Sequence, residues 1–121
     1  MNLTTALIIL TVLTALFLLK RAGQISSEKA LAHLKSGALL IDVRTPSEFS
    51  SGHLPSAINL PLDQIETALP RQVKNKSQML LLHCQSGMRS GVAKKKLNAL
   101  GYSNAFNVGS YGRAAKIVSE R

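Results

Sequence analysis

Apolar and polar positions divide this chain of 121 residues into two parts. The first nineteen residues carry no charged side chain, and residues 3–19 are Leu, Ile, Val, Phe and Ala broken only by four threonines. A helix over this run is about 26 Å long, close to the ~30 Å hydrocarbon thickness of a bilayer. We therefore expect a transmembrane anchor with a basic flank over residues 1–21, inserted through residues 3–19, and a separate domain over residues 22–121.

Two alternatives compete with this anchor. A cleaved signal peptide carries basic residues before its apolar run, whereas Lys20 and Arg21 follow the run here. A buried core helix usually shows polar positions at helical spacing. Because basic flanks stay on the cytoplasmic side, the sequence predicts a single-pass protein of the cell membrane with its domain in the cytoplasm.

After residue 22, apolar runs of strand type alternate with apolar positions at helical spacing. The continuous runs predict strands at residues 38–43, 57–60, 79–83 and 104–108. The helical spacing predicts helices at residues 25–35, 62–69, 90–100 and 111–118, with Pro46 opening a further helical turn and Pro70 ending the second helix. This alternation favours an α/β fold with a mostly parallel central sheet and helices on both faces.

The only cysteine of the chain, Cys84, follows the strand predicted at residues 79–83. In a parallel sheet this is the edge at which ligands bind. Gly87 allows the next residues to curl until their amides point at the sulfur, and these amides, the following helix N-terminus and Arg89 would favour the thiolate. We therefore identify Cys84 as the candidate nucleophile, with a small core residue as the alternative.

The net charge of +9 arises from fifteen basic and six acidic residues. Such an excess indicates a nucleic acid, an anionic membrane surface or a small anion as partner. With no Trp, two Tyr and three Phe there is little aromatic surface for base stacking, so we expect no nucleic-acid partner. One cysteine excludes an internal disulfide, and the pattern predicts no metal or organic cofactor.

Two stretches resemble the signatures of rhodanese domains. Residues 40–62, LIDVRTPSEFSSGHLPSAINLPL, resemble the first signature, and residues 80–90, LLLHCQSGMRS, resemble the active-site loop in which four residues separate Cys from Arg. The resemblance covers residues 24–108. It implies a rhodanese-like α/β domain whose cysteine accepts a sulfane sulfur and becomes a persulfide.

On this resemblance Cys84 is the catalytic sulfur carrier. The substrate-binding residues that it implies are Gln85, Ser86, Gly87, Met88, Arg89 and Ser90. Asp42, Arg44 and Glu48 would support the fold near the loop, and Glu48 is expected to pair with Arg44 at helical spacing. His83 would point to the opposite face from Cys84, so we expect it to pack and not to act as a base.

The implied activity is that of a rhodanese-type thiosulfate sulfurtransferase. It would move a sulfane sulfur from an anionic donor such as thiosulfate, through a Cys84 persulfide, to a thiol, to cyanide or to a protein sulfur acceptor. Two alternatives stay open: a membrane-tethered persulfide carrier or docking module, and a small phosphatase of the related fold, whose loop has five residues between Cys and Arg. The chain also departs from the family pattern, because residues 108–113 read VGSYGR where many rhodanese domains carry a Gly-Gly pair and then a Trp.

Overall fold

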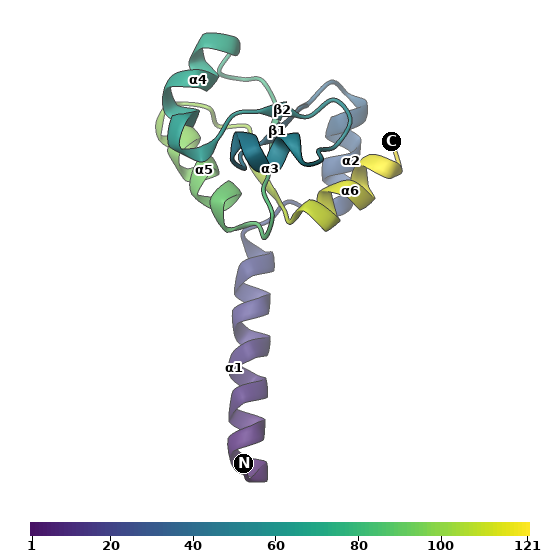
Figure 1. Cartoon of the computed structure of the whole chain (residues 1–121), viewed down its shortest axis with the longest axis vertical. Helices are drawn as coiled ribbons and strands as arrows, with labels where there is room; N and C mark the ends of the chain where they lie inside the picture. Colours follow the sequence, from purple (N-terminus) through teal and green to yellow (C-terminus); the bar gives the residue numbers. More distant parts are fainter.

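The computed structural model describes the backbone of residues 1–121 and all side chains except those of residues 20–22. Helix α1 (Leu3–Ala22) extends away from a domain that contains all later elements (Figure 1). In chain order these are α2 (Ser27–Lys35), β1 (Leu39–Asp42), α3 (Pro46–Ser50), β2 (Ile58–Asn59), the 3-10 helix η1 (Leu62–Gln64), α4 (Ile65–Gln72), β3 (Leu80–His83), α5 (Met88–Ala99), β4 (Ala105–Gly109) and α6 (Tyr111–Ser119).

The strands form a parallel sheet of order β2-β1-β3-β4. Asp42 at the end of β1 pairs with His83 at the end of β3, and His83 pairs with Gly109 at the end of β4. The carboxyl ends of these three strands therefore meet at one edge of the sheet. Cys84, the residue after β3, lies at that edge.

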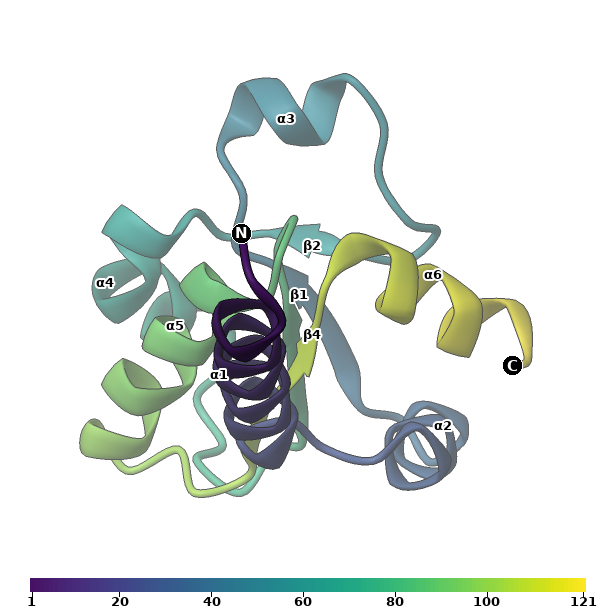
Figure 2. The ribbon, with the colours of Figure 1, turned by 90° about the horizontal axis from the view of Figure 1, so that it is seen from below.

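Helices cover both faces of the sheet, with α4 and α5 on one face and α2 and α6 on the other (Figure 2). Successive residues of β3 alternate between the two layers: Leu80 and Leu82 belong to the cluster that includes residues of α4 and α5, whereas Leu81 belongs to the cluster with α2 and α6. All three leucines are fully buried. The predicted α/β fold with a parallel central sheet is confirmed.

The helix predicted over residues 62–69 differs in detail. The short helix η1 precedes α4, and α4 continues through Pro70 to Gln72. Proline removes the hydrogen bond that its own amide would make to the preceding turn. At the C-terminal end of α4 the Val73 amide still donates to the Leu69 carbonyl at 2.8 Å, so the last turn closes.

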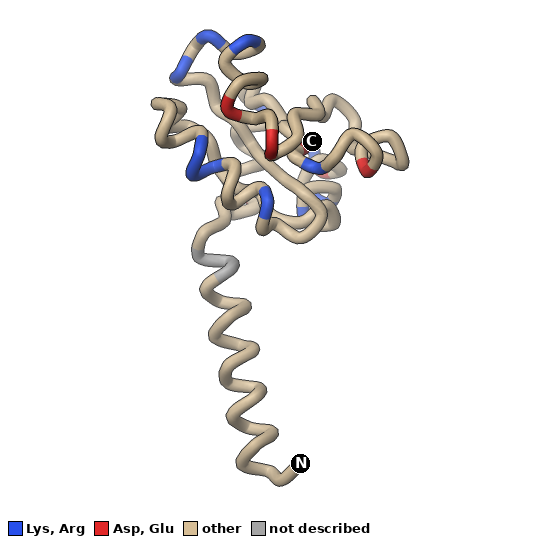
Figure 3. The backbone as a smooth tube through the Cα atoms, turned by 60° about the vertical axis from the view of Figure 1, so that its left-hand side comes forward, with Lys and Arg blue, Asp and Glu red and all other residues tan. Residues whose placement is uncertain are grey.

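The predicted transmembrane helix is not supported. The described part of α1 is uncharged (Figure 3), but among residues whose side chains are described no helix is long and apolar enough to cross a membrane. Lys20 and Arg21, on which the predicted orientation depended, lie outside the described side chains.

Replacing Leu81 by Ala should lower the free energy of unfolding by roughly 2–5 kcal/mol, because the side chain is fully buried between the sheet and its helices. The matched control is Val92→Ala on α5, where the side chain is 45% exposed and the loss should stay below about 1 kcal/mol. Urea unfolding of the full chain measures both changes. Equal losses in the two variants would contradict the assigned layers.

Candidate active site

Cys84 lies beneath the turn that connects β3 to α5, and its side chain is completely buried. The Gly87 amide donates to the sulfur, with 3.0 Å between N and Sγ. Gly87 has a φ of +96°, in the left-handed region, which lets the chain reverse before α5 begins at Met88. The backbone of the turn thus curls over the sulfur.

Opposing effects act on the Cys84 thiol. Burial raises its pKa, whereas the Ser90 hydroxyl and the backbone amides of Ser90, Gly87 and Ser86 lower it, and the net shift is downward. The N-terminus of α5 adds its positive dipole end to the same place. The site therefore favours a thiolate although the sulfur is shielded from water.

Two ion pairs flank the turn. Arg89 donates from Nη1 and Nη2 to the two carboxylate oxygens of Glu48 at 2.6 and 3.0 Å. Arg44 instead pairs with Asp42 at 2.7 Å and donates to the Gly52 carbonyl at 2.8 Å. The expected pairing of Glu48 with Arg44 is wrong, because Asp42 binds the Arg44 guanidinium and Glu48 turns toward the cysteine loop.

Helix α3 holds Glu48 in place through a capping box. The Glu48 amide donates to Thr45 Oγ1 at 3.2 Å, and the Thr45 amide donates to Glu48 Oε1 at 3.1 Å. Arg89, and then Thr45, lower the pKa of the Glu48 carboxyl to about 2. Glu48 is therefore ionised at neutral pH, and both terminal nitrogens of Arg89 bind its carboxylate.

His83 is completely buried, as are the neighbouring side chains of the sheet edge. Burial lowers its pKa, so the imidazole is neutral near pH 7. Its Nε2 lies 3.7 Å from the Asp42 carboxylate, and its ring meets the Tyr111 ring edge-on at 5.8 Å between centroids. These contacts agree with the packing role expected for His83.

The segment that departs from the family pattern still contacts the cysteine loop. The Cys84 amide donates to the Gly109 carbonyl at 3.2 Å, and the Tyr111 amide donates to the Gln85 carbonyl at 3.2 Å. The Arg44 guanidinium lies 4.7 Å from the centre of the Tyr111 ring. Tyr111 therefore joins the loop to the buried Asp42–Arg44 pair.

The sequence did not reveal two residues of this site. Asn107 on β4 accepts from the Ser90 hydroxyl at 2.7 Å and donates to the Gly87 carbonyl at 3.0 Å. The only feature of the sequence that marks Asn107 is its polar side chain within a run of apolar residues. The Gln24 side chain lies against Gly87 and Gly109. A Cβ added at Gly109 would come within 2.8 Å of Gln24 Oε1. No pattern marks Gln24, because it lies between elements.

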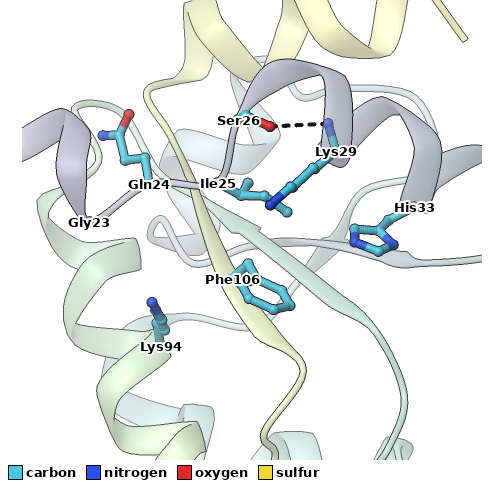
Figure 4. A pocket seen from close by; sticks show the side chains of 8 residues that line it. All are labelled: Gly23, Gln24, Ile25, Ser26, Lys29, His33, Lys94 and Phe106. Atoms are coloured by element: carbon cyan, nitrogen blue, oxygen red, sulfur yellow. Dashed lines mark hydrogen bonds between the residues drawn. The ribbon is translucent and has the colours of Figure 1, made fainter.

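Cavities border the turn on both sides. One of about 430 Å³ includes Arg89 in its lining, and another of about 440 Å³ includes Gly87 and Met88. A further cavity of about 690 Å³ lies at the linker between α1 and α2, with Phe106 of β4 between His33 and Lys94 (Figure 4). Of the predicted substrate-binding residues, Gly87, Met88 and Arg89 thus line ligand-sized spaces, while Ser90 and the sulfur itself are buried.

Comparison with known proteins gives one consistent result. Residues 26–112 match the rhodanese-like domain. Thiosulfate sulfurtransferase PspE of Escherichia coli is 35% identical over 69 residues, which cover 57% of this chain and 66% of that protein. The human thiosulfate:glutathione sulfurtransferase is 32% identical over 104 residues, covering 74% of this chain and 90% of that protein.

A solved structure of the human single-domain sulfurtransferase TSTD1 superimposes with a TM-score of 0.66 at 27% identity, covering 78% of this chain and 96% of that one. The alignments with several curated relatives are partial, because the chain spans about 55 to 66% of their length.

Replacing Gly109 by Ala should lower the free energy of unfolding by about 1–3 kcal/mol and disturb the cysteine loop. Gly109 has a φ of +106°, in the left-handed region that residues other than glycine rarely adopt, and an added Cβ would also displace the end of the Gln24 side chain. Gly112→Ala is the matched control, because its Cβ meets nothing within 4 Å and α6 should gain about 0.5–1 kcal/mol. Thermal unfolding compares the two variants, and equal effects would contradict the need for glycine at position 109.

The Cys84 thiol should titrate below its ordinary value of 9.0 in the folded chain and near it in urea. Because the folded pKa is the lower one, this group stabilises the fold above the unfolded pKa, and the contribution is lost as pH falls through the folded pKa. Thiolate absorbance near 240 nm measures the titration after subtraction of the Cys84→Ser spectrum. A folded midpoint at or above the unfolded one would contradict the assigned amide contacts.

Proposed function

Because this chain belongs to the rhodanese-like domain family, we propose that it is a sulfurtransferase that carries a sulfane sulfur as a persulfide on Cys84. The donor is a small sulfur anion such as thiosulfate, and the acceptor is a thiol or cyanide. The observation that carries this proposal is the convergence of loop amides on a single sulfur whose pKa they lower.

In the first half-reaction the Cys84 thiolate attacks the terminal sulfur of thiosulfate. A new S–S bond forms to Sγ, the S–S bond of thiosulfate breaks, and its electron pair leaves with sulfite. Two negative species must meet for this step. The amides of Ser86 and Gly87, the start of α5 and the Arg89 guanidinium offset their repulsion. In the second half-reaction the acceptor thiolate takes the outer sulfur and regenerates the Cys84 thiolate.

Arg89 links the binding of the donor to its access to the Cys84 sulfur. Both of its terminal nitrogens bind Glu48, and the Cys84 sulfur is buried. A donor anion that replaces the Glu48 carboxylate would satisfy the same guanidinium fork and bring its terminal sulfur toward Cys84. We therefore assign Arg89 as the donor-binding residue and Glu48 as the residue that holds it before the donor arrives.

The identity of the sulfur acceptor is a separate and more specific proposal. Similarity to proteins named thiosulfate:glutathione sulfurtransferase supports a small thiol, and a protein cysteine is a further candidate. Turnover separates an enzyme from a persulfide carrier: with glutathione in excess, an enzyme releases many sulfite molecules per chain, whereas a carrier stops after one.

The location at the cell membrane, with the domain on its cytoplasmic side, is a separate proposal. Its support is the surface of α1, on which the large apolar side chains of residues 3–19 are 44 to 76% exposed. Fractionation of cells that produce the full chain, followed by protease treatment of right-side-out vesicles, tests it. Recovery of the full chain in the soluble fraction would exclude this location.

Intact-mass analysis after incubation with thiosulfate tests the function. The full chain should gain about 32 Da, one sulfur, and lose it again on addition of cyanide. Cys84→Ser should gain nothing. The proposal fails if the mass stays unchanged while the Cys84 thiol remains free to react with iodoacetamide.

Replacing Arg89 by Ala should raise the KM for thiosulfate about 10- to 100-fold, because two charge-assisted hydrogen bonds to the donor are lost. Arg89→Lys should recover only part of this, since an ammonium lacks the planar fork. Arg71→Ala, an exposed arginine on α4, is the control for the general loss of positive charge. Sulfite release at varied thiosulfate measures KM, and equal KM values for Arg89→Ala and Arg71→Ala would remove Arg89 from the donor site.

A further inference from the structure

The hydroxyl of Ser90 lies between two acceptors. Its Oγ is 2.7 Å from Asn107 Oδ1 and 3.5 Å from Cys84 Sγ. A serine hydroxyl carries one proton, so it donates fully to only one of them at a time. The acceptor that receives the hydrogen bond from Ser90 therefore determines how much negative charge remains on the Cys84 sulfur.

The orientation of the Asn107 amide settles the direction of the shorter bond. Its oxygen also accepts the Gly109 amide at 2.9 Å, and its nitrogen donates to the Gly87 carbonyl at 3.0 Å. A backbone amide can only donate and a carbonyl can only accept, so exchanging the oxygen and nitrogen of Asn107 would break both bonds. The Ser90 hydroxyl is therefore the donor at 2.7 Å, and its proton points to Asn107.

Asn107 is held firmly enough to compete for this proton. It is 6% exposed, on β4 next to the strand that leads to Cys84. The Gly87 carbonyl that it binds also accepts the Gly91 amide at 3.1 Å, which closes the first turn of α5. One buried side chain thus contacts the helix start and the hydroxyl nearest the sulfur.

We propose that Asn107 is a positioning residue that holds the Ser90 proton away from Cys84 and so preserves the nucleophilicity of its thiolate. This role rests on the proposed function of Cys84 as the sulfur nucleophile. Among thiolates, reactivity rises with basicity. A hydroxyl that donated fully to the sulfur would make the thiolate easier to form and less reactive.

Asn107→Leu removes the acceptor that competes with Cys84 for the Ser90 proton, and it keeps a side chain of similar size. The Ser90 proton should then turn to the sulfur and lower the thiol pKa by about half a unit to one unit, roughly the effect of one hydrogen bond. Persulfide formation at a pH where the thiol is fully ionised should slow about 1.5- to threefold. A merely structural role predicts the opposite sign, because a loosened loop withdraws amides that lower the pKa.

A double-mutant series tests this without relying on one variant. Ser90→Ala is made with Asn, Leu and Asp at position 107, and the thiol pKa is read from thiolate absorbance. The rise in pKa caused by Ser90→Ala should be largest beside Leu, smaller beside Asn and smallest beside Asp, whose carboxylate holds the hydroxyl proton most strongly.

The proposal is overturned if Ser90→Ala has the same effect in all three backgrounds, or if Asn107→Leu raises the thiol pKa. Should the Leu variant not fold, the comparison of Asn with Asp decides alone. The absorbance readout needs no turnover, so the series is decided even if the chain forms no persulfide with thiosulfate.

Discussion

Convergence of backbone amides on one sulfur is the interaction on which the rest of this domain depends. The amides face Cys84 only because β3 ends and α5 begins within a few residues, with Gly87 in a left-handed conformation between them. β1 and β4 flank β3 on its two sides, and the chain beyond each strand contacts the turn or the groups beside it. The apolar layers on the two faces of the sheet therefore serve the site indirectly, since they fix the strand ends from which the turn is built.

Charge is divided between two arginines with different surroundings. Arg44 is buried, pairs with Asp42 and packs against the Tyr111 ring, so its charge is paired within the fold. Arg89 is about one third exposed and pairs with Glu48 at the rim. A buried pair is expensive to separate, whereas a half-exposed pair exchanges partners readily. Only Arg89 is suited to binding a ligand that comes and goes.

Apolar periodicity was sufficient to place the strands and most helices, because β1, β3 and β4 are largely buried by the layers on the two faces of the sheet. The cysteine loop was also found, since its residues are contiguous. The ion pairs were not predicted correctly. A spacing of four residues suggested that Glu48 pairs with Arg44, whereas its actual partner, Arg89, is 41 residues away in the sequence. Asn107 and Gln24 were missed for the same reason: their contacts with the loop exist only after β4 and the linker before α2 are placed. The transmembrane helix was expected from both the length and the apolar composition of residues 3–19, but among the residues whose side chains are described no helix is long and apolar enough to cross a membrane.

The VGSYGR segment shows how the fold accommodates a departure from the family pattern. Ser110, whose own backbone is extended, caps α6 by accepting the Arg113 amide at 3.1 Å and forms a bridge with Ser86 of the cysteine loop. Tyr111 then supplies an amide to the Gln85 carbonyl and a ring to the Arg44 guanidinium. A glycine pair would make the backbone contact but not the ring contact. Because a ring over a buried guanidinium is worth about 0.5–2 kcal/mol, Tyr111 stabilises the edge of the site next to Arg44.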